Sequence, residues 1–329
     1  MRLWLPLIVV VALIIIAYAG VSGAGMNYLF GVFIPYVAFL IFLIGFISRV
    51  VKWGRSPVPF RIPTTAGQGK SLPWIKENKI DNPSTTGGVI IRMLLEIFLF
   101  RSLFRNVKSE LSDGKLAYGS AKWLWLAGLA FHYSFLTVLI RHLRFFTDPI
   151  PFFVRGAETL DGILQVGVPV LYQTDIVIVA AATYLLLRRL VIPQLRYISL
   201  AADYFPLFLI LAIAGSGILM RYFFKTNIVG VKELTMGLVT FSPKIPEGIG
   251  VIFYVHLFLV SVLFAYFPFS KLMHLGGVFL SPTRNLANNN RMQRHINPWN
   301  YPVKVHTYEE YEDEFREKMK EAGLPVEKE

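Results

Sequence analysis

Long runs of apolar residues alternate with polar segments along the chain. A helix needs about 20 apolar residues to cross a bilayer. Six runs approach that length: 3–19, 28–47, 123–140, 168–187, 204–224 and 249–269. The third run continues as an apolar pattern to residue 146, and the sixth continues to residue 280. The pattern therefore predicts an all-α integral membrane protein, built as a bundle of six transmembrane helices.

The first run admits a second interpretation. Ala17-Tyr18-Ala19 has the small-x-small pattern of a signal-peptide cleavage site. Only Arg2 precedes the run as a basic residue, and Pro6 falls early, where a helix tolerates it. We interpret the run as a membrane anchor.

The basic residues are distributed unevenly between the connections. The chain has 33 Lys and Arg against 21 Asp and Glu, a net charge of +12, and only 16% of its residues are charged. Such an excess is typical of the inner loops of a membrane protein, so we expect no nucleic-acid partner. With the N-terminus inside, six spans place 26 basic residues on the inner side and 7 on the outer side. This predicts a multi-pass protein of the cell (inner) membrane with both termini in the cytoplasm.

Two polar segments divide the chain into four parts. Residues 1–51 hold two spans, 52–122 form a cytoplasmic loop, 123–280 form a four-helix core, and 281–329 form an extended cytoplasmic tail. The loop begins with a Pro- and Gly-rich stretch that excludes regular structure. It continues with RMLLEIFLFRSLFRNVKSEL, which we interpret as a helix lying on the inner leaflet. The tail ends in YEEYEDEFREKMKEAG, a predicted short helix, and we expect the tail to bind a partner protein; a disordered tail is the alternative.

Cysteine is absent, and this excludes disulfides, thiol catalysis and iron–sulfur ligation by this chain. A metal would therefore need His, Met or carboxylate ligands. Four of the six histidines lie in the third and sixth apolar runs, where ionisable residues are costly and usually functional. They are His132 and His142 in the third run and His256 and His274 in the sixth. The other two, His295 and His306, lie in the polar tail and are not expected to bind a cofactor.

The topology predicts how the four histidines pair. The third span runs outward and the sixth runs inward, so His132 and His274 lie toward the inner side, and His142 and His256 toward the outer side. Ten helical residues span about 15 Å and eighteen span about 27 Å. Eighteen residues also return to the same helix face. Helix tilt and side-chain direction would have to absorb the axial mismatch.

Two histidines per site suit haem iron better than zinc. Zinc takes four protein ligands in structural sites, whereas haem iron needs two axial ligands because the porphyrin supplies the rest. We therefore predict two non-covalently held b-type haems, one on each side of the membrane, that transfer electrons across it. Ordinary hydrogen bonds between helices are the alternative role of these histidines.

Several neighbours of these histidines fit a haem site. The anionic propionates would pair with basic residues, although these side chains also extend to lipid phosphates in many membrane proteins. The propionate candidates are Arg141, Arg144 and Lys271. Small residues would let a macrocycle or a neighbouring helix approach, and ordinary helix packing explains them equally well. They are Gly128, Gly215 and Gly217.

The histidine spacing of 10 in one span and 18 in the last resembles the gamma (cytochrome b) subunit of respiratory nitrate reductase, over roughly residues 120–280. The tail motif NNNRMQRHINPWN and the loop motif LLEIFLFRSLFRN resemble more specifically the membrane cytochrome b subunits DsrM and HmeC of the Dsr complex, which is linked to dissimilatory sulfite reduction. The cytochrome b subunit of membrane-bound heterodisulfide reductase is the nearest alternative. The extra first span and the long inner loop depart from the five-span nitrate reductase pattern, so its quinol-site residues do not carry over.

The resemblance implies a membrane subunit of a menaquinol-dependent oxidoreductase complex, with no complete activity in this chain alone. It implies that menaquinol is oxidised near the outer haem and that electrons pass inward. The acceptor would be an iron–sulfur subunit resembling the catalytic subunit of heterodisulfide reductase (DsrK or HmeD), among other subunits of the same complex. The lack of cysteine agrees, because the clusters must then lie in a partner.

Polar residues at the predicted outer ends of the spans are candidates for the quinol site. They are Arg144, Asp148, Gln165, Tyr172, Asp175 and Arg221. A haem-free transporter is the alternative from another class. It would use Asp175 and Asp203, the acidic residues in or near spans, but no inverted repeat supports it. A haem-free anchor for peripheral enzymes is a third interpretation.

Overall fold

The computed structural model describes residues 3–56, 67–105, 107–112, 114–162, 170–289 and 306–328. Within these residues the regular secondary structure is helical apart from one two-stranded hairpin. Five helical segments are long and apolar enough to cross a membrane: Trp4–Ser22, Leu29–Gly54, Lys122–Phe145, Ala201–Phe223 and Val251–Phe269. The prediction of an all-helical chain with several membrane spans is confirmed, whereas the count of six is not.

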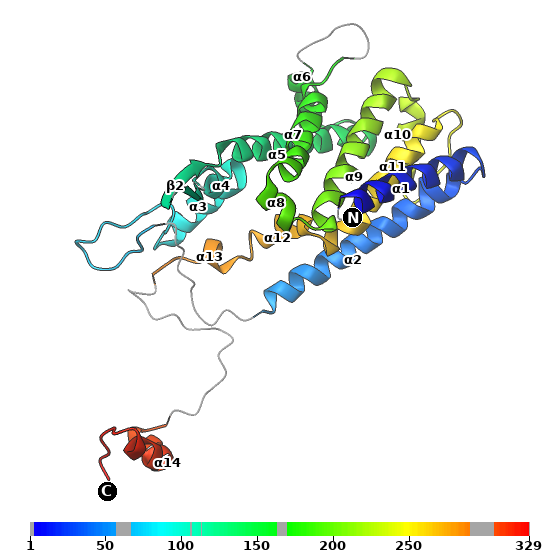
Figure 1. The fold of residues 1–329 in the computed structure, drawn as a ribbon. Coiled ribbons are helices and arrows are strands. Elements are labelled where there is room, and N and C mark those ends of the chain that lie inside the picture. Colours follow the sequence, from blue (N-terminus) through cyan, green and yellow to red (C-terminus); the bar gives the residue numbers. More distant parts are fainter. Residues whose placement is uncertain are drawn as a thin grey trace.

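Most of the five spans combine an α-helix with a differently wound turn. α1 is Trp4–Ser22. The others are η1 (Leu29–Phe33) with α2 (Ile34–Gly54), α5 (Lys122–His142) with η2 (Leu143–Phe145), α9 (Ala201–Ile218) with η3 (Leu219–Phe223), and α11 (Val251–Tyr266) with η4 (Phe267–Phe269). Figure 1 shows α1 and α2 running alongside α11, with α9 packed against α1 and α11.

The run expected at 168–187 forms α7 (Gln173–Val191), which begins later than predicted. Residues 163–169 lie outside the described part of the chain. α7 carries three charged residues, Asp175, Arg188 and Arg189, and is therefore not among the five apolar spans. It packs against both α5 and α9, so it belongs to the same helical bundle.

The apolar core lies on one side of this bundle, among α1, α9, α11 and α10 (Ile228–Val239). Leu209, Leu234 and Leu259 are fully buried there. α5 lies outside this core and is covered least by other protein segments. Only 6% of its span is buried, against 22–33% of the other four spans.

The last span is interrupted before His274. α11 ends at Tyr266, η4 contains Pro268, and Ser270 adopts an extended backbone with ψ of 177°. Proline lacks the N–H that a continuing helix needs. The Ser270 hydroxyl then accepts from Leu272 N at 3.1 Å and starts the turn η5 (Lys271–Met273), which leads into α12 (His274–Gly277). The expectation that one continuous helix carries both His256 and His274 is therefore wrong.

We call residues 52–122 the inner loop, after the predicted orientation. The sequence predicts a single interfacial helix in this loop, and the structure differs. α3 (Thr86–Leu99) ends at Phe100, whose φ of 48° is left-handed. Two side chains of α5 cap the carbonyl groups at the C-terminal end of α3. Trp125 Nε1 donates to Leu99 O at 2.7 Å, and Tyr133 OH donates to Phe98 O at 2.9 Å. After the short α4 (Arg101–Arg105), the chain forms the hairpin of β1 (Val107–Ser112) and β2 (Lys115–Ser120), paired in antiparallel register from Val107↔Ser120 to Ser112↔Lys115.

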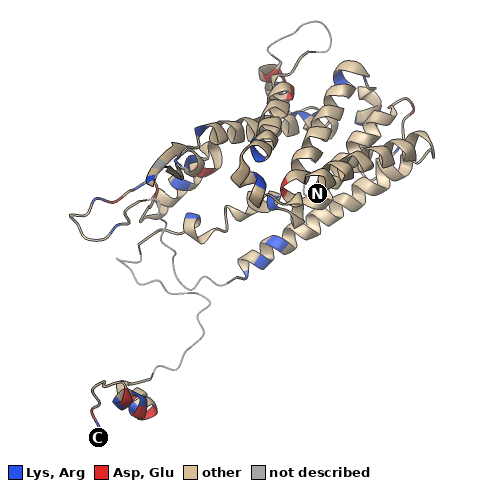
Figure 2. Ribbon diagram, in the orientation of Figure 1, with Lys and Arg blue, Asp and Glu red and all other residues tan. Residues whose placement is uncertain are grey.

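The basic residues of α4 have a partner within the loop. Arg101 binds Asp81 at 3.0 Å, and Arg105 binds the same carboxylate. Figure 2 shows Lys and Arg gathered on the α3–α4 region and more at the C-terminal end of α2. Arg101 and Arg105 therefore stabilise the fold of the loop through Asp81, and they also add positive charge to this side of the protein.

The tail begins by returning to the inner loop. After α13 (Pro282–Asn285), Asn288 donates from N to Pro83 O at 2.8 Å and from Nδ2 to Asn82 Oδ1 at 2.6 Å. Both asparagines are more than nine-tenths buried. The tail is thus tied to the loop about 200 residues earlier in the chain.

The predicted helix at the end of the tail is confirmed as α14 (Tyr308–Glu321). Thr307 and Glu310 form a capping box at its start. The backbone N–H groups of Glu327 and Lys328 donate to the Glu312 carboxylate at 2.8 Å, and they hold the pKa of Glu312 below its usual value. The last residues therefore fold back onto α14.

Candidate functional site

The structure brings four histidines together in two pairs, each joining α5 to the last span. The rings of His132 and His274 have centroids 5.9 Å apart and planes at 82°. The rings of His142 and His256 have centroids 6.4 Å apart and planes at 13°. These are the pairs that the topology predicted. We call His132 with His274 the inner pair and His142 with His256 the outer pair, after the sides on which the sequence prediction places them.

Both separations match two imidazoles that bind one metal ion from opposite sides. A metal–imidazole bond is about 2.0–2.1 Å long, and the centre of each ring lies about 1 Å behind its ligating nitrogen. Two coaxial ligands therefore have centroids about 6 Å apart. Ligation does not fix rotation about the metal–nitrogen bond, so both interplanar angles are compatible with it.

The hydrogen bonds of the histidines leave one nitrogen available on each ring. Three of the Nδ1 atoms lie close to a carbonyl oxygen of their own helix or turn: His132 to Gly128 O at 2.8 Å, His142 to Val138 O at 2.7 Å and His274 to Lys271 O at 2.9 Å. His256 Nδ1 instead lies 2.9 Å from Ser216 Oγ on α9. A carbonyl oxygen only accepts, so Nδ1 carries the proton on His132, His142 and His274 and Nε2 keeps its lone pair, as in most metal-binding histidines. A hydroxyl both donates and accepts, so the contact of His256 fits either tautomer.

The donor set in the described part of the chain fits haem better than a metal held by protein alone. Its histidines, aspartates and glutamates form no cluster of three or more that could hold a metal ion. Two imidazoles with free Nε2 atoms satisfy an iron whose other four ligands come from a porphyrin. The sparse protein cover of α5 agrees with a helix that has a large flat group beside it.

Beside the outer pair, Arg141 is buried in a polar cluster at the end of α5. Its Nη1 lies 2.5 Å from Asp161 and its Nη2 3.1 Å from Asp175. Its guanidinium also lies 3.6 Å from the centre of the Tyr172 ring. The Nε atom is buried without a hydrogen-bond partner among the described residues, so one donor of Arg141 remains for a further acceptor.

Three quinol-site candidates join this cluster. The Arg221 guanidinium lies 4.0 Å from the centre of the Tyr172 ring and donates to Val170 O at 3.0 Å. Tyr222, which the sequence analysis missed, donates to Asp175 at 2.8 Å and accepts from Tyr172 N at 3.0 Å. Two arginines and two aspartates balance in charge, as burial requires. We call Arg141, Asp161, Tyr172, Asp175, Arg221 and Tyr222 the outer cluster.

The remaining candidates lie outside the outer cluster. Arg144 binds Glu158 at 2.9 Å, on α6 (Phe152–Asp161). Asp148 is 70% exposed and lies 3.5 Å from Lys232. Lys271, beside the inner pair, binds Asp203 at 2.6 Å and remains 73% exposed. Gln165 and His295 lie outside the described residues, and His306 is exposed beside Glu310.

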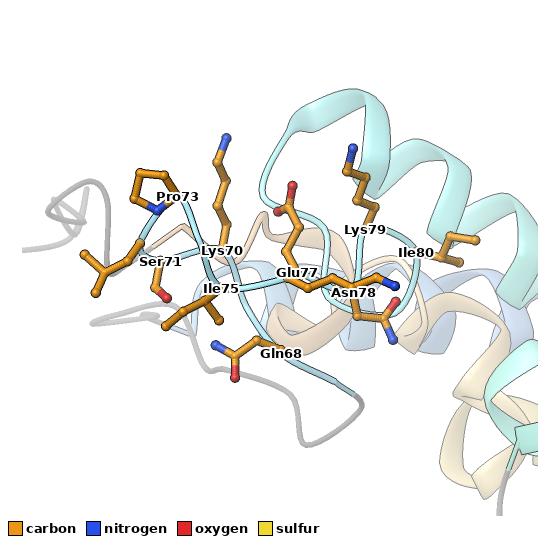
Figure 3. Close-up of a pocket in the computed structure, with 11 residues that line it drawn as sticks. Gln68, Lys70, Ser71, Pro73, Ile75, Glu77, Asn78, Lys79 and Ile80 are labelled. Atoms are coloured by element: carbon orange, nitrogen blue, oxygen red, sulfur yellow. The ribbon is translucent and has the colours of Figure 1, made fainter.

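Figure 3 shows a pocket on the inner loop that is separate from the histidines. Lys70, Glu77 and Lys79 extend their side chains to the same side of it. The residues that line it lie between Gln68 and Ile80. This hollow is therefore a feature of the loop, and the histidine pairs are the stronger candidate for function.

Two residues that position the site were missed by the sequence analysis. Asp161 accepts from Thr174 N, Thr174 Oγ1 and Arg141, and so anchors α6 to α5 and α7. Ser216 is the polar residue between Gly215 and Gly217 in an apolar span. A polar side chain between two small residues was the available signal for Ser216, whereas nothing local marks Asp161.

Comparison with known proteins now gives the family. The profile of the nitrate reductase gamma subunit matches residues 96–295, more than half of the chain and the part that carries all four paired histidines. The chain belongs to the nitrate reductase gamma subunit family. It is 50% identical over 278 residues to the Hdr-like menaquinol oxidoreductase cytochrome b-like subunit of Archaeoglobus fulgidus, covering 82% of this chain and 83% of the relative. The protein of the same name from Archaeoglobus profundus is 44% identical over 273 residues, 81% of each chain. The predicted resemblance is confirmed.

We expect Asp161→Ala to destabilise the protein strongly. Removing one partner of a buried ion pair costs about 3–5 kcal/mol, and the lower end applies because Asp175 still pairs with Arg141. The matched control is Asp148→Asn, whose exposed ion pair contributes about 0–1 kcal/mol. Thermal unfolding in detergent, followed by circular dichroism, measures both. Equal midpoints for the two variants would contradict the role given to Asp161.

Proposed function

We propose that this chain is the membrane cytochrome b subunit of a menaquinol oxidoreductase, and that the inner and outer pairs each hold one haem b. The observation that carries the proposal is the geometry of the four histidines. Two pairs from the same two segments have ring centroids 5.9 and 6.4 Å apart, and every Nδ1 is engaged by a neighbour. The names of the relatives support the cytochrome b and menaquinol parts of the proposal.

The chain's own groups would orient and bind the haems. A haem with two histidine ligands supplies one-electron transfer and has no open position for oxygen. The carbonyls and the Ser216 hydroxyl that face Nδ1 direct each Nε2 toward the centre of its pair. Arg141 Nε is the candidate donor for a propionate of the outer haem, and the exposed Lys271 is the candidate for the inner haem. Arg144 is a weaker candidate because Glu158 already binds it.

We propose that electrons pass from the outer side of the membrane to the inner side. We propose that α7 is a sixth span, that both termini are cytoplasmic, and that the inner pair lies beside the inner loop. Menaquinol would be oxidised on the outer side, near the outer cluster, and would release its protons there. Its electrons would pass from the outer to the inner haem and then to an iron–sulfur subunit of the heterodisulfide-reductase type (DsrK- or HmeD-like), which acts on a sulfur substrate. This chain has no cysteine, so those clusters lie in the partner.

Single histidine variants separate the two sites. His142→Ala or His256→Ala should leave one haem per chain and abolish reduction by menaquinol, because electrons enter at the outer haem. His132→Ala or His274→Ala should also leave one haem, which menaquinol still reduces. Pyridine haemochromogen assays count the haems, and stopped-flow absorbance follows their reduction.

The control is His306→Ala, which should retain two haems because His306 is exposed in the tail. Normal menaquinol reduction in His142→Ala would contradict the proposed order of electron transfer. Two haems per chain in the outer-pair variants and also in the inner-pair variants would contradict the assignment of the ligands.

The lack of cysteine allows a clean test of topology. Single variants Thr159→Cys, Gln194→Cys and Ser109→Cys place one thiol each on α6, on α8 (Pro193–Ile198) and on β1, all at exposed positions. Six spans with cytoplasmic termini predict that an impermeant maleimide labels Thr159→Cys in intact cells. The other two should react only after permeabilisation. Labelling of both Thr159→Cys and Gln194→Cys from outside would show that α7 does not cross the membrane, and labelling of Gln194→Cys without Thr159→Cys would show the opposite orientation.

A further inference from the structure

The four paired histidines differ in what faces their Nδ1 atoms. Three of them face a backbone carbonyl within four residues along the chain. His256 on α11 is the exception, because its Nδ1 lies 2.9 Å from the hydroxyl of Ser216, which belongs to a different helix. The outer pair is therefore asymmetric, because a side-chain hydroxyl faces Nδ1 of His256 but not Nδ1 of His142.

The proposed ligation sets the direction of this hydrogen bond. A histidine that binds iron through Nε2 carries its proton on Nδ1, so His256 Nδ1–H donates to Ser216 Oγ. The Ser216 hydroxyl donates in turn to Ile213 O at 2.9 Å. Ile213 O also faces the His256 ring as a hydrogen-bond acceptor.

Helix packing holds Ser216 in place. The residue is 8% exposed, and the next residue is glycine. A Cβ added at Gly217 would lie 3.5 Å from His256 Cε1, so α9 approaches the imidazole closely at this level. The Ser216 hydroxyl on α9 therefore makes a buried, closely packed contact with His256 on α11.

We propose that Ser216 is a positioning residue that sets the reduction potential of the outer haem apart from that of the inner haem. The inference rests on the proposed function, because it requires a haem on His142 and His256. A hydrogen bond from the second ring nitrogen raises the basicity of a metal-binding histidine, and such bonds are one means by which a protein tunes haem iron. A hydroxyl is a weaker acceptor than a peptide carbonyl, so His256 donates less electron density than a carbonyl-backed histidine. Removing the hydroxyl lowers that donation further and favours ferrous iron.

The test is a potentiometric titration of the full-length chain in its complex, followed by visible absorbance. Ser216→Ala should raise one of the two midpoint potentials and leave the other unchanged. Ser216→Cys, which keeps the size but has a weak sulfur acceptor, should shift the same midpoint in the same direction. Ser216→Thr retains the hydroxyl and should match the wild type. The control is Ser261→Ala, because Ser261 is also buried and also donates to a carbonyl of its own helix, Leu257 O, but faces no paired histidine.

The outcomes separate this inference from the proposed function. Two haems with unchanged potentials in Ser216→Ala and Ser216→Cys would overturn the inference alone. A downward shift would also overturn it, since it would mean that a stronger acceptor such as Ile213 O takes the Nδ1 proton. An equal shift of the midpoint potential in Ser261→Ala would also overturn the inference, because the effect would then come from the loss of any buried hydroxyl. Absence of haem in the wild type would overturn the proposed function and, with it, the role of Ser216.

Discussion

The site depends on one geometric constraint: two helices must bring their histidines to a spacing of about 6 Å at two depths. On α5 the two histidines are ten residues apart, which corresponds to about 15 Å of continuous helix. On the last span they are eighteen residues apart, which would correspond to about 27 Å. The value of 27 Å does not apply to the structure, because the helix is interrupted at Pro268 and Ser270, before His274.

The same break determines the surroundings of the inner pair. The turn that follows Ser270 places Lys271 against Asp203 of α9, and its carbonyl faces His274 Nδ1. On the opposite side, Phe100 packs edge-on to His132 with ring centroids 5.0 Å apart. Phe100 is the left-handed residue where α3 ends, so the folding of the inner loop also contributes to the position of His132.

Local patterns were sufficient to predict five apolar spans, the two histidine pairs, α14 and the family. Apolar run length, basic-residue distribution and residue spacing are properties of one segment at a time. The break in the last span was missed because its apolar pattern continues without interruption through Pro268, although proline was a visible signal. The hairpin was missed although Asp113-Gly114, a typical hairpin turn, lies between its strands. Asp161 could not be predicted, because only the fold brings it near Arg141. Ser216 carried a local signal, but its partner His256 lies on another helix, so its role could not be predicted.

The central claim is that the four histidines hold two b haems. The most direct test is a reduced-minus-oxidised visible spectrum of the purified wild-type chain, with quantitation of the haem as its pyridine haemochromogen. The account predicts two non-covalently bound haems per chain and the absorbance of a low-spin b-type cytochrome. A well-folded preparation without a haem band would contradict it.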